Sequence, residues 1–315
     1  MIPNQTFLND IRHSPDGSTQ VFRGPDAEVR PAVRGGQSGR PCARGRSARG
    51  RSGFSLIELL ISTSVVVLLV TLLTPAVSFC REVARRTQCM NRMRQLSVAL
   101  HNYSHLHGVL PPGSVNPDGP IVTQEQGYHM NWLVQVLPFL DEEACYQHID
   151  FQNSVYAKAN RRVRQRRLSL LICPADSLAG QTLPGSSYVG STGGLDEPIR
   201  EDNTGLLFLN SSIRFAEIRD GASYTILLGE RLASDSPTAV DPGWMSGTSA
   251  TLRHTTMATG QNSKIPLPQQ TGGFGAAHRS MHVALADGAV KAMNGGSAVW
   301  RELGCREDGS MHPGF

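Results

Sequence analysis

The stretch FSLIELLISTSVVVLLVTLLTPAVSFC, residues 54–80, decides the architecture of this 315-residue chain. Its 27 residues contain one charged side chain, Glu58. As a helix rising ~1.5 Å per residue it would be about 40 Å long, more than the ~30 Å hydrocarbon layer of a bilayer. A secretory signal peptide is the alternative, but its apolar region is usually shorter and is followed by small residues, whereas Gly53 precedes this run. We therefore predict a transmembrane helix over 54–80.

The excess positive charge of the chain lies ahead of this segment. Residues 1–53 hold nine arginines and four acidic residues, and the whole chain has a net charge of +4, so the rest has −1. A body without net positive charge has no general attraction for phosphate, and we expect no nucleic-acid partner. The first 53 residues are rich in Pro, Gly, Arg and Ser and lack the apolar residues of a core. They predict a disordered basic leader.

The helix is expected to continue outside the membrane over residues 81–110. Apolar residues recur there at spacings of three and four: Cys89, Met93, Leu96, Leu100 and Tyr103. This pattern predicts one apolar stripe on an amphipathic helix, which should end near Gly108, ahead of Pro111. We expect the stripe to pack on a globular domain that fills residues 111–315.

That domain is predicted to be a sheet with long loops. Short apolar runs separated by turn residues suggest antiparallel strands, in 205–209, 214–218, 224–230, 282–286 and 289–293. Asp220-Gly221 and Asp287-Gly288 are sequences typical of type I′ hairpins. The stretch 234–273, rich in Pro, Gly, Ser and Thr, is expected to be a variable loop. The predicted fold class is α+β, with the long helix packed on the sheet.

The junction of leader and apolar run resembles a known processing site. Gly53-Phe54-Ser55-Leu56-Ile57-Glu58-Leu59-Leu60 is similar to the site of type IV prepilins and type II secretion pseudopilins, where a basic leader and Gly precede Phe-(Thr/Ser)-Leu-x-Glu and a long apolar helix. The resemblance implies cleavage after Gly53 by a prepilin peptidase and N-methylation of Phe54. It also implies that Glu58 pairs with the amino terminus of a neighbouring subunit, which would give an acid in an apolar layer a partner. Pro75 resembles the helix-bending proline of these proteins. The first apolar residues of the predicted membrane helix include Leu56, Ile57, Leu59 and Leu60.

From about residue 53 to 310 the chain also resembles a planctomycete prepilin-like family of unknown function. The pieces that carry the resemblance are Arg85-Arg86-x-x-Cys89-x-Asn91, Leu100–Tyr103, His107-Gly108, Trp132–Leu140, Ile172–Asp176, Ile218–Ile226 and His278–Gly288. The last piece matches a terminal His-(nine residues)-Asp-Gly motif, although eight residues separate His278 from Asp287 here. The resemblance implies a pilin-like fold, with family-motif turns at Asp220, Gly221, His278, Asp287 and Gly288.

The resemblance also bears on the cysteines. Four cysteines lie in the domain and in the helix ahead of it: Cys89, Cys145, Cys173 and Cys305. If the domain is exported to an oxidising compartment, these four can form disulfides in three different connectivities. The residues alone do not choose among these connectivities. Cys89 and Cys173 stand in family pieces, so the resemblance implies a disulfide between them.

Motifs for catalysis or for metal and cofactor binding are absent. The chain has no GxSxG, Walker A, dinucleotide-binding, HExxH or CxxC sequence. We therefore expect no enzyme activity, no cofactor and no metal. The pairs His101/His105 and His278/His282 offer two ligands each, too few for a closed site. Asp220 and Asp287 suit turn stabilisation better than calcium binding.

Five arginines within residues 161–167 form a basic run. The run is either a solvated face or a contact for anionic polysaccharide, lipid headgroups or nucleic acid. It has no interleaved aromatic residues for base stacking, which weakens the last of these readings.

These features predict a single-pass inner-membrane protein whose leader is cytoplasmic and whose domain lies in the periplasm or at the cell surface. Its function would be that of a non-enzymatic subunit of a type II secretion or type IV pilus-like assembly. The expected partners are the prepilin peptidase, other pilin-like subunits and the lipid bilayer. One alternative is a periplasmic or cell-surface binding protein that uses the pilin-type segment only as an anchor, and a weaker one is a secreted hydrolase.

Overall fold

The computed structural model describes residues 53, 55–176, 184–232, 241–257, 269–278, 280–293 and 299–309. The chain divides into two compact units, 1–58 and 59–315. In the first unit, only Gly53 and residues 55–58 are described, and the predicted leader otherwise lies outside the described residues, as does Phe54.

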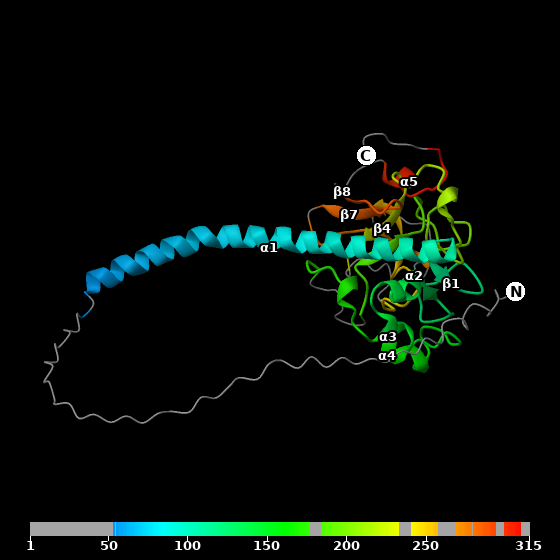
Figure 1. The fold of residues 1–315 in the computed structure, drawn as a ribbon, viewed down its shortest axis with the longest axis horizontal. Helices are drawn as coiled ribbons and strands as arrows, with labels where there is room; N and C mark the ends of the chain where they lie inside the picture. The colour runs from blue at the N-terminus through cyan, green and yellow to red at the C-terminus, as the bar shows by residue number, and fades with distance from the viewer. Residues whose placement is uncertain are drawn as a thin grey trace, which may run out of the picture. The chain divides into compact units, whose positions relative to one another are not determined.

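Helix α1 (Leu56–His107) runs unbroken for 52 residues, blue to cyan in Figure 1. Residues 55–88 are all exposed, and burial begins at Cys89. From there a stripe is buried, comprising Cys89, Met93, Leu96, Ser97, Ala99, Leu100 and Ser104. Gly108 has a φ of +76° and donates its N–H to the Ser104 carbonyl at 2.8 Å, a left-handed cap that ends the helix. The predicted amphipathic helix is thus present, and it ends at His107, beside the predicted end near Gly108.

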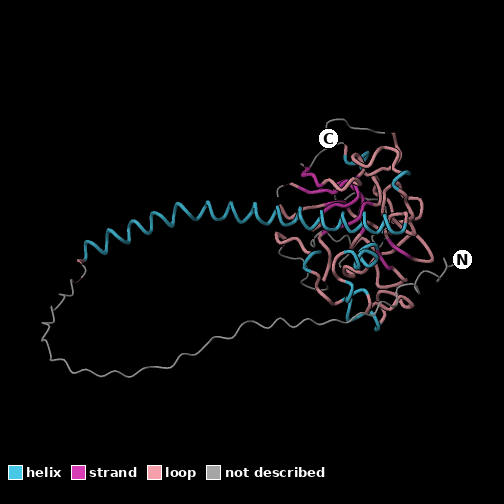
Figure 2. Tube along the Cα trace, viewed as in Figure 1, coloured by secondary structure: helices cyan, strands magenta, loops and turns pink. Residues whose placement is uncertain are grey.

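Six strands form the main sheet in the order β6-β5-β3-β4-β7-β8, and the strands are magenta in Figure 2. The strands are β3 (Tyr188–Ser191), β4 (Ile226–Glu230), β5 (Leu252–Met257), β6 (Gly273–Phe274), β7 (Met281–Leu285) and β8 (Val290–Met293). The pairs β3–β4, β4–β7 and β7–β8 are antiparallel. Strand β5 instead runs parallel to both β3 and β6. The fold is α+β as expected, but the sheet is mixed and not wholly antiparallel.

The remaining elements are short. A two-stranded sheet pairs β1 (Ser114–Val115) with β2 (Met130–Asn131). The short helices are α2 (Trp132–Val136), η2 (Leu137–Phe139), α3 (Glu143–Tyr146), η3 (Lys158–Asn160), α4 (Arg161–Arg164), η4 (Ser169–Leu171), η5 (Phe215–Glu217) and α5 (Trp300–Leu303).

The sheet separates two groups of buried apolar residues. One group includes alternate residues of β7 with residues of α5: Met281, Val283, Leu285, Trp300 and Leu303. The other combines the stripe of α1 with the opposite face of the sheet: Met93, Leu96, Leu100, Leu228 and Ala284. Successive side chains of a strand point to opposite faces, so His282, between Met281 and Val283, is on the face that α1 covers.

Three expectations about the domain are wrong. Residues 205–209 form no strand of the sheet but an irregular segment, in which the Leu207 N–H donates to the Ser191 carbonyl at 3.0 Å. Residues 215–217 form the 3₁₀ helix η5. The supposed variable loop 234–273 contains β5, whose sequence Leu-Arg-His-Thr-Thr-Met has no apolar alternation. Pairing with β3 makes it a strand, because strand formation depends on neighbours more than on local preference.

The two Asp-Gly turns also differ from type I′ hairpins. Asp287-Gly288 lies in the β7–β8 hairpin, where the Gly288 N–H donates to the Leu285 carbonyl at 3.0 Å. Gly288 has a φ of +90°, whereas Asp287 is not in the left-handed region, so the loop is a type I turn followed by a bulge. Asp220-Gly221 connects η5 to β4 and makes no hairpin.

We expect Leu96→Ala to lower the free energy of unfolding of the detergent-solubilised protein by about 2–5 kcal/mol, because it removes a wholly buried side chain and leaves a cavity. Val98→Ala is the matched control, since Val98 is on the same helix but 57% exposed, and should change it by less than about 0.5 kcal/mol. Chemical denaturation followed by circular dichroism measures both. Equal effects would contradict packing of α1 through this face.

Candidate functional site

The first candidate site is the exposed apolar part of α1. Large apolar side chains between Leu56 and Phe79 are 45–80% exposed. So continuous an apolar surface marks a membrane or protein interaction site rather than a stable face toward water. Among the described residues, α1 is the one helix long and apolar enough to cross a membrane.

The residues predicted for processing lie at the start of this segment. Gly53 is exposed and precedes α1, and Glu58 is exposed in its first turn, where a negative charge is favourable to the helix dipole. Pro75 lies inside α1, and the helix continues through it. The four apolar residues expected in the membrane helix are exposed too: Leu56, Ile57, Leu59 and Leu60. Cleavage after Gly53 stays a prediction.

The second candidate site is a buried polar cluster on the sheet face covered by α1. Its members are the buried Cys89 of α1, Cys173, Tyr188 of β3, Glu230 of β4, His282 of β7 and the side chain of His278, together with Arg86 of α1, which is exposed at the edge of the cluster. The strand register aligns three of them, because Tyr188 pairs with Glu230, and the pairing of Gly229 with Val283 sets Glu230 opposite His282. Paired residues of neighbouring strands point to the same face of a sheet, so these three side chains all face α1.

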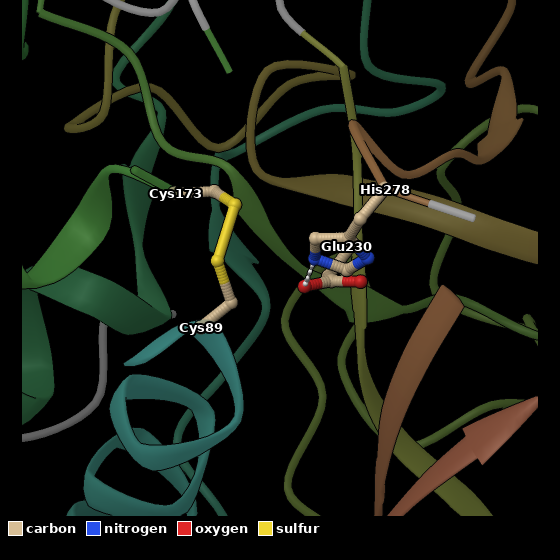
Figure 3. A group of neighbouring side chains, drawn as sticks. All are labelled: Cys89, Cys173, Glu230 and His278. Carbon is tan, nitrogen blue, oxygen red and sulfur yellow. Dashed lines mark ion pairs between the residues drawn. A yellow bond between two sulfur atoms is a disulfide. The ribbon is translucent and has the colours of Figure 1, made fainter. Parts of the chain in front are cut away.

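A disulfide joins Cys89 of α1 to Cys173, and both residues are buried (Figure 3). This is the pair that the family resemblance implied. Two hydrogen bonds accompany it: Arg92 donates to the Ile172 carbonyl, and the Tyr188 hydroxyl donates to the Cys89 carbonyl at 3.2 Å. Residues 84 apart in sequence are therefore cross-linked where α1 enters the domain. The free cysteines among the described residues are Cys80, Cys145 and Cys305.

Glu230 is the centre of the cluster, beside the disulfide (Figure 3). Its Oε2 accepts the backbone N–H of His282 at 2.8 Å, and the His282 Nδ1 lies 3.3 Å from the carboxylate. The His278 Nε2 lies 3.1 Å from Glu230 Oε1 as an ion pair. Arg86 Nε donates to His282 Nε2 at 3.1 Å, so the proton of a neutral His282 must be on Nδ1, facing the carboxylate.

The charges in the cluster set its protonation. Burial by itself raises the pKa of Glu230, but the two neighbouring histidines outweigh it and leave that pKa below its ordinary value. Burial lowers the pKa of His278, but Glu230 outweighs it and raises that pKa above its ordinary value. The pair therefore favours an ionised Glu230 and a protonated His278. Removing one member of such a buried pair is costly, because the other charge is left without its partner.

The Asp-Gly residues of the family motifs hold backbone. The buried Asp220 carboxylate accepts the N–H groups of Asp308 at 2.9 Å and Gly309 at 2.8 Å, which ties residues 308–309 to the turn between η5 and β4. Asp287 accepts the Ala289 N–H at 2.8 Å within its own loop. His278 also contacts backbone, since its Nδ1 lies 2.7 Å from the Ser280 carbonyl, but its Nε2 meets the Glu230 carboxylate.

The basic run of residues 161–167 is partly used inside the domain. Arg164 pairs with Glu125 at 3.0 Å, and Arg166 with Glu142 at 2.9 Å. Among the predicted histidine pairs, His101 stacks on Phe215 with ring centroids 5.0 Å apart, whereas His105 is exposed.

Glu230 and Arg86 were not identified as site residues from the sequence. A signal existed for Glu230, because it lies two residues after Leu228 in an apolar strand and so shares its buried face. For Arg86 the sequence has no such signal, since its partner His282 is 196 residues away.

Comparison with known proteins identifies one matching protein family. The model of a family described as a protein of unknown function (DUF1559) matches residues 79–295, about two thirds of the chain. That range contains every member of the buried cluster. No curated protein and no solved structure matches the chain.

We expect the stability difference between the wild type and His278→Gln to depend on pH. Because the pKa of His278 is raised in the folded protein, its contribution is fully present below its ordinary pKa of about 6.5 and is lost as the pH rises through the folded-state value. Urea denaturation of both proteins at a series of pH values measures the difference. His105→Gln is the control, since His105 is exposed, and should change the free energy of unfolding by less than about 0.5 kcal/mol. A pH-independent difference for His278→Gln would contradict the ion pair.

Proposed function

We propose that this chain, which belongs to the DUF1559 family of planctomycete prepilin-like proteins, is a non-enzymatic, membrane-anchored subunit of a type II secretion or type IV pilus-like assembly. The observation that carries the proposal is the division of α1. One continuous helix has an exposed apolar part, residues 56–79, and a part built into the domain from Cys89 onward. A subunit that moves from membrane to fibre needs a helix with both parts, because the exposed part must be covered first by lipid and then by other subunits while the other part holds the domain.

The exposed part suits both environments of a pilin-like subunit. At ~1.5 Å per residue, residues 56–79 extend about 36 Å, enough for the ~30 Å hydrocarbon layer. In a fibre the same surface would be covered by the corresponding helices of neighbouring subunits. Glu58 favours the fibre over the membrane. Its carboxylate is disfavoured in the apolar layer of the bilayer, whereas in a fibre it would lie beside the amino terminus of a neighbouring subunit.

The buried cluster supports a mechanical role for the domain. Any force along α1 enters the domain at residues 86–93, where the Cys89–Cys173 disulfide and the Arg86–His282 hydrogen bond join helix and sheet. A covalent link at that point keeps the domain and its helix together under load. A loosely tethered binding domain would not need so many bonds at the entry point.

The proposed processing creates the working N-terminus. A prepilin peptidase would cleave after Gly53, which is exposed just before α1, and methylation would follow at Phe54. The mature chain would then be anchored in the inner membrane by α1, with its domain on the periplasmic side. Its partners would be other pilin-like subunits and the bilayer.

We expect the protein isolated from its native membrane to begin with N-methyl-phenylalanine at position 54. Intact-mass and peptide mass spectrometry of the mature N-terminus test this directly. Gly53→Val should leave the leader attached, since the peptidase site is then lost, and it leaves the rest of the chain unchanged. A wild-type protein with its leader intact, or cut after Cys80, would contradict the proposed processing.

We expect Glu58→Ala to be processed and inserted normally but to be lost from the fibre fraction by about tenfold or more, because the charge pairing that aligns subunits is removed. Sheared fibres quantified by immunoblotting against membrane fractions measure this. Glu82→Ala is the control, since Glu82 is an exposed acid on α1 beyond the apolar run, and should assemble like the wild type. If no fibre contains the wild type and Glu58→Ala localises normally, the chain instead uses the segment only as the anchor of a binding protein.

A further inference from the structure

Four potential metal ligands from distant parts of the sequence meet in the buried cluster. The Sγ atoms of Cys89 and Cys173, a carboxylate oxygen of Glu230 and a ring nitrogen of His278 all lie within 4.8 Å of one another (Figure 3). All four side chains are nearly inaccessible to solvent: Cys89 is 0% exposed, Cys173 4%, Glu230 2%, and the side chain of His278 1%. In the oxidised protein the two sulfurs are bonded to each other and are not available as thiolates.

The spacing suits a tetrahedral cation. Bonds of ~2.3 Å to sulfur and ~2.0–2.1 Å to nitrogen or oxygen place tetrahedral ligand atoms about 3.3–3.8 Å apart. The His278 Nε2 and Glu230 Oε1 are already 3.1 Å apart. The Cys89 and Cys173 Cα atoms are 5.4 Å apart, so once the S–S bond is broken their sulfurs can separate to the required distance by side-chain rotation.

The surroundings orient these groups as ligands. His278 Nδ1 lies 2.7 Å from the Ser280 carbonyl, which holds a proton on Nδ1, so Nε2 is the nitrogen that can release its proton and bind a cation. That Nε2 is buried and faces Glu230 Oε1 at 3.1 Å, so these two ligand atoms already point to one place. Glu230 Oε2 is fixed by the His282 N–H at 2.8 Å, so Oε1 is the oxygen turned toward His278. Such second contacts are typical of built metal sites.

We propose that, when the Cys89–Cys173 disulfide is reduced, the two thiolates, Glu230 and His278 bind one divalent cation of the zinc type. Reduction by a dithiol gives two electrons to the S–S bond, so the dithiol becomes a disulfide and its two protons pass to the cysteine sulfurs. The cation then displaces these two protons, and the proton of His278 Nε2, to solvent. Reoxidation by a disulfide reverses the sequence: the cation leaves, the S–S bond forms, and the two electrons reduce the oxidant.

The charges of the neighbourhood favour this exchange. Two thiolates and a carboxylate bring three negative charges, and a divalent cation leaves one, which Arg86 faces through its hydrogen bond to His282. Paired and compensated charges are the condition for burying them. In the oxidised state a covalent bond joins α1 to Cys173, and in the reduced state the cation joins α1 to Cys173, Glu230 and His278. The entry point of α1 thus stays cross-linked in both redox states.

The test is a cobalt titration of the full chain in detergent, reduced with a phosphine and freed of metal. We expect one Co²⁺ per chain, with a thiolate-to-cobalt charge-transfer band and the intense visible bands of tetrahedral coordination, both removed by Zn²⁺. The oxidised chain should show neither. Cys89→Ser/Cys173→Ser should abolish the bands, and Glu230→Gln and His278→Gln should each weaken binding by about tenfold or more.

The matched control is Cys145→Ser/Cys305→Ser, which removes the two other buried thiols and should keep the bands. X-ray absorption spectroscopy of the reduced wild type should find two sulfur and two nitrogen or oxygen ligands, and it needs no variant that might misfold. A reduced wild type without tetrahedral bands, whether folded or unfolded, would overturn the proposal. So would bands that persist in Cys89→Ser/Cys173→Ser, or a set of four sulfur ligands.

Discussion

One helix in two environments is the constraint on which the rest of the structure depends. Up to residue 79, α1 needs apolar surroundings that the chain itself does not supply, and from Cys89 its stripe is the core of the domain. The nine residues 80–88 that separate these parts are exposed and include four charged side chains. The domain therefore holds the helix at this point, because Arg86 lies near the end of the charged stretch and the Cys89–Cys173 disulfide directly follows it.

The sheet makes that grip possible through its register. Strands β3, β4 and β7 place Tyr188, Glu230 and His282 in one row across the sheet, on the face that receives α1. Each of these polar groups is buried, and each finds a partner in the row, on α1 or at His278. Buried charges are tolerated only when they are paired, so the row and the helix depend on each other.

The sequence predicted much of this fold for clear reasons. A long apolar run with one acid, followed by a stripe at helical spacing, has few other solutions, and α1 follows both. The hairpin around Asp287-Gly288 was also predictable, because left-handed Gly288 and alternating strands are local signals. The strands β5 and β6 were not, since their pairing partners lie far away in sequence and their own residues carry no clear period. The run 205–209 was predicted as a strand from its apolar residues alone. It forms no strand of the sheet, because strand pairing depends on partners that lie far away in sequence.

The sequence by itself determined the exposed helix, its processing-type motif and the family to which the chain is similar, because these depend on short-range order of residue types. Only the tertiary structure decided the buried cluster. Its members stand at positions 86, 89, 173, 188, 230, 278 and 282, and no spacing relates them. The β4–β7 register and the packing of α1 bring them together. Burial then strengthens the interactions between their charges and places four potential ligand atoms close to one another.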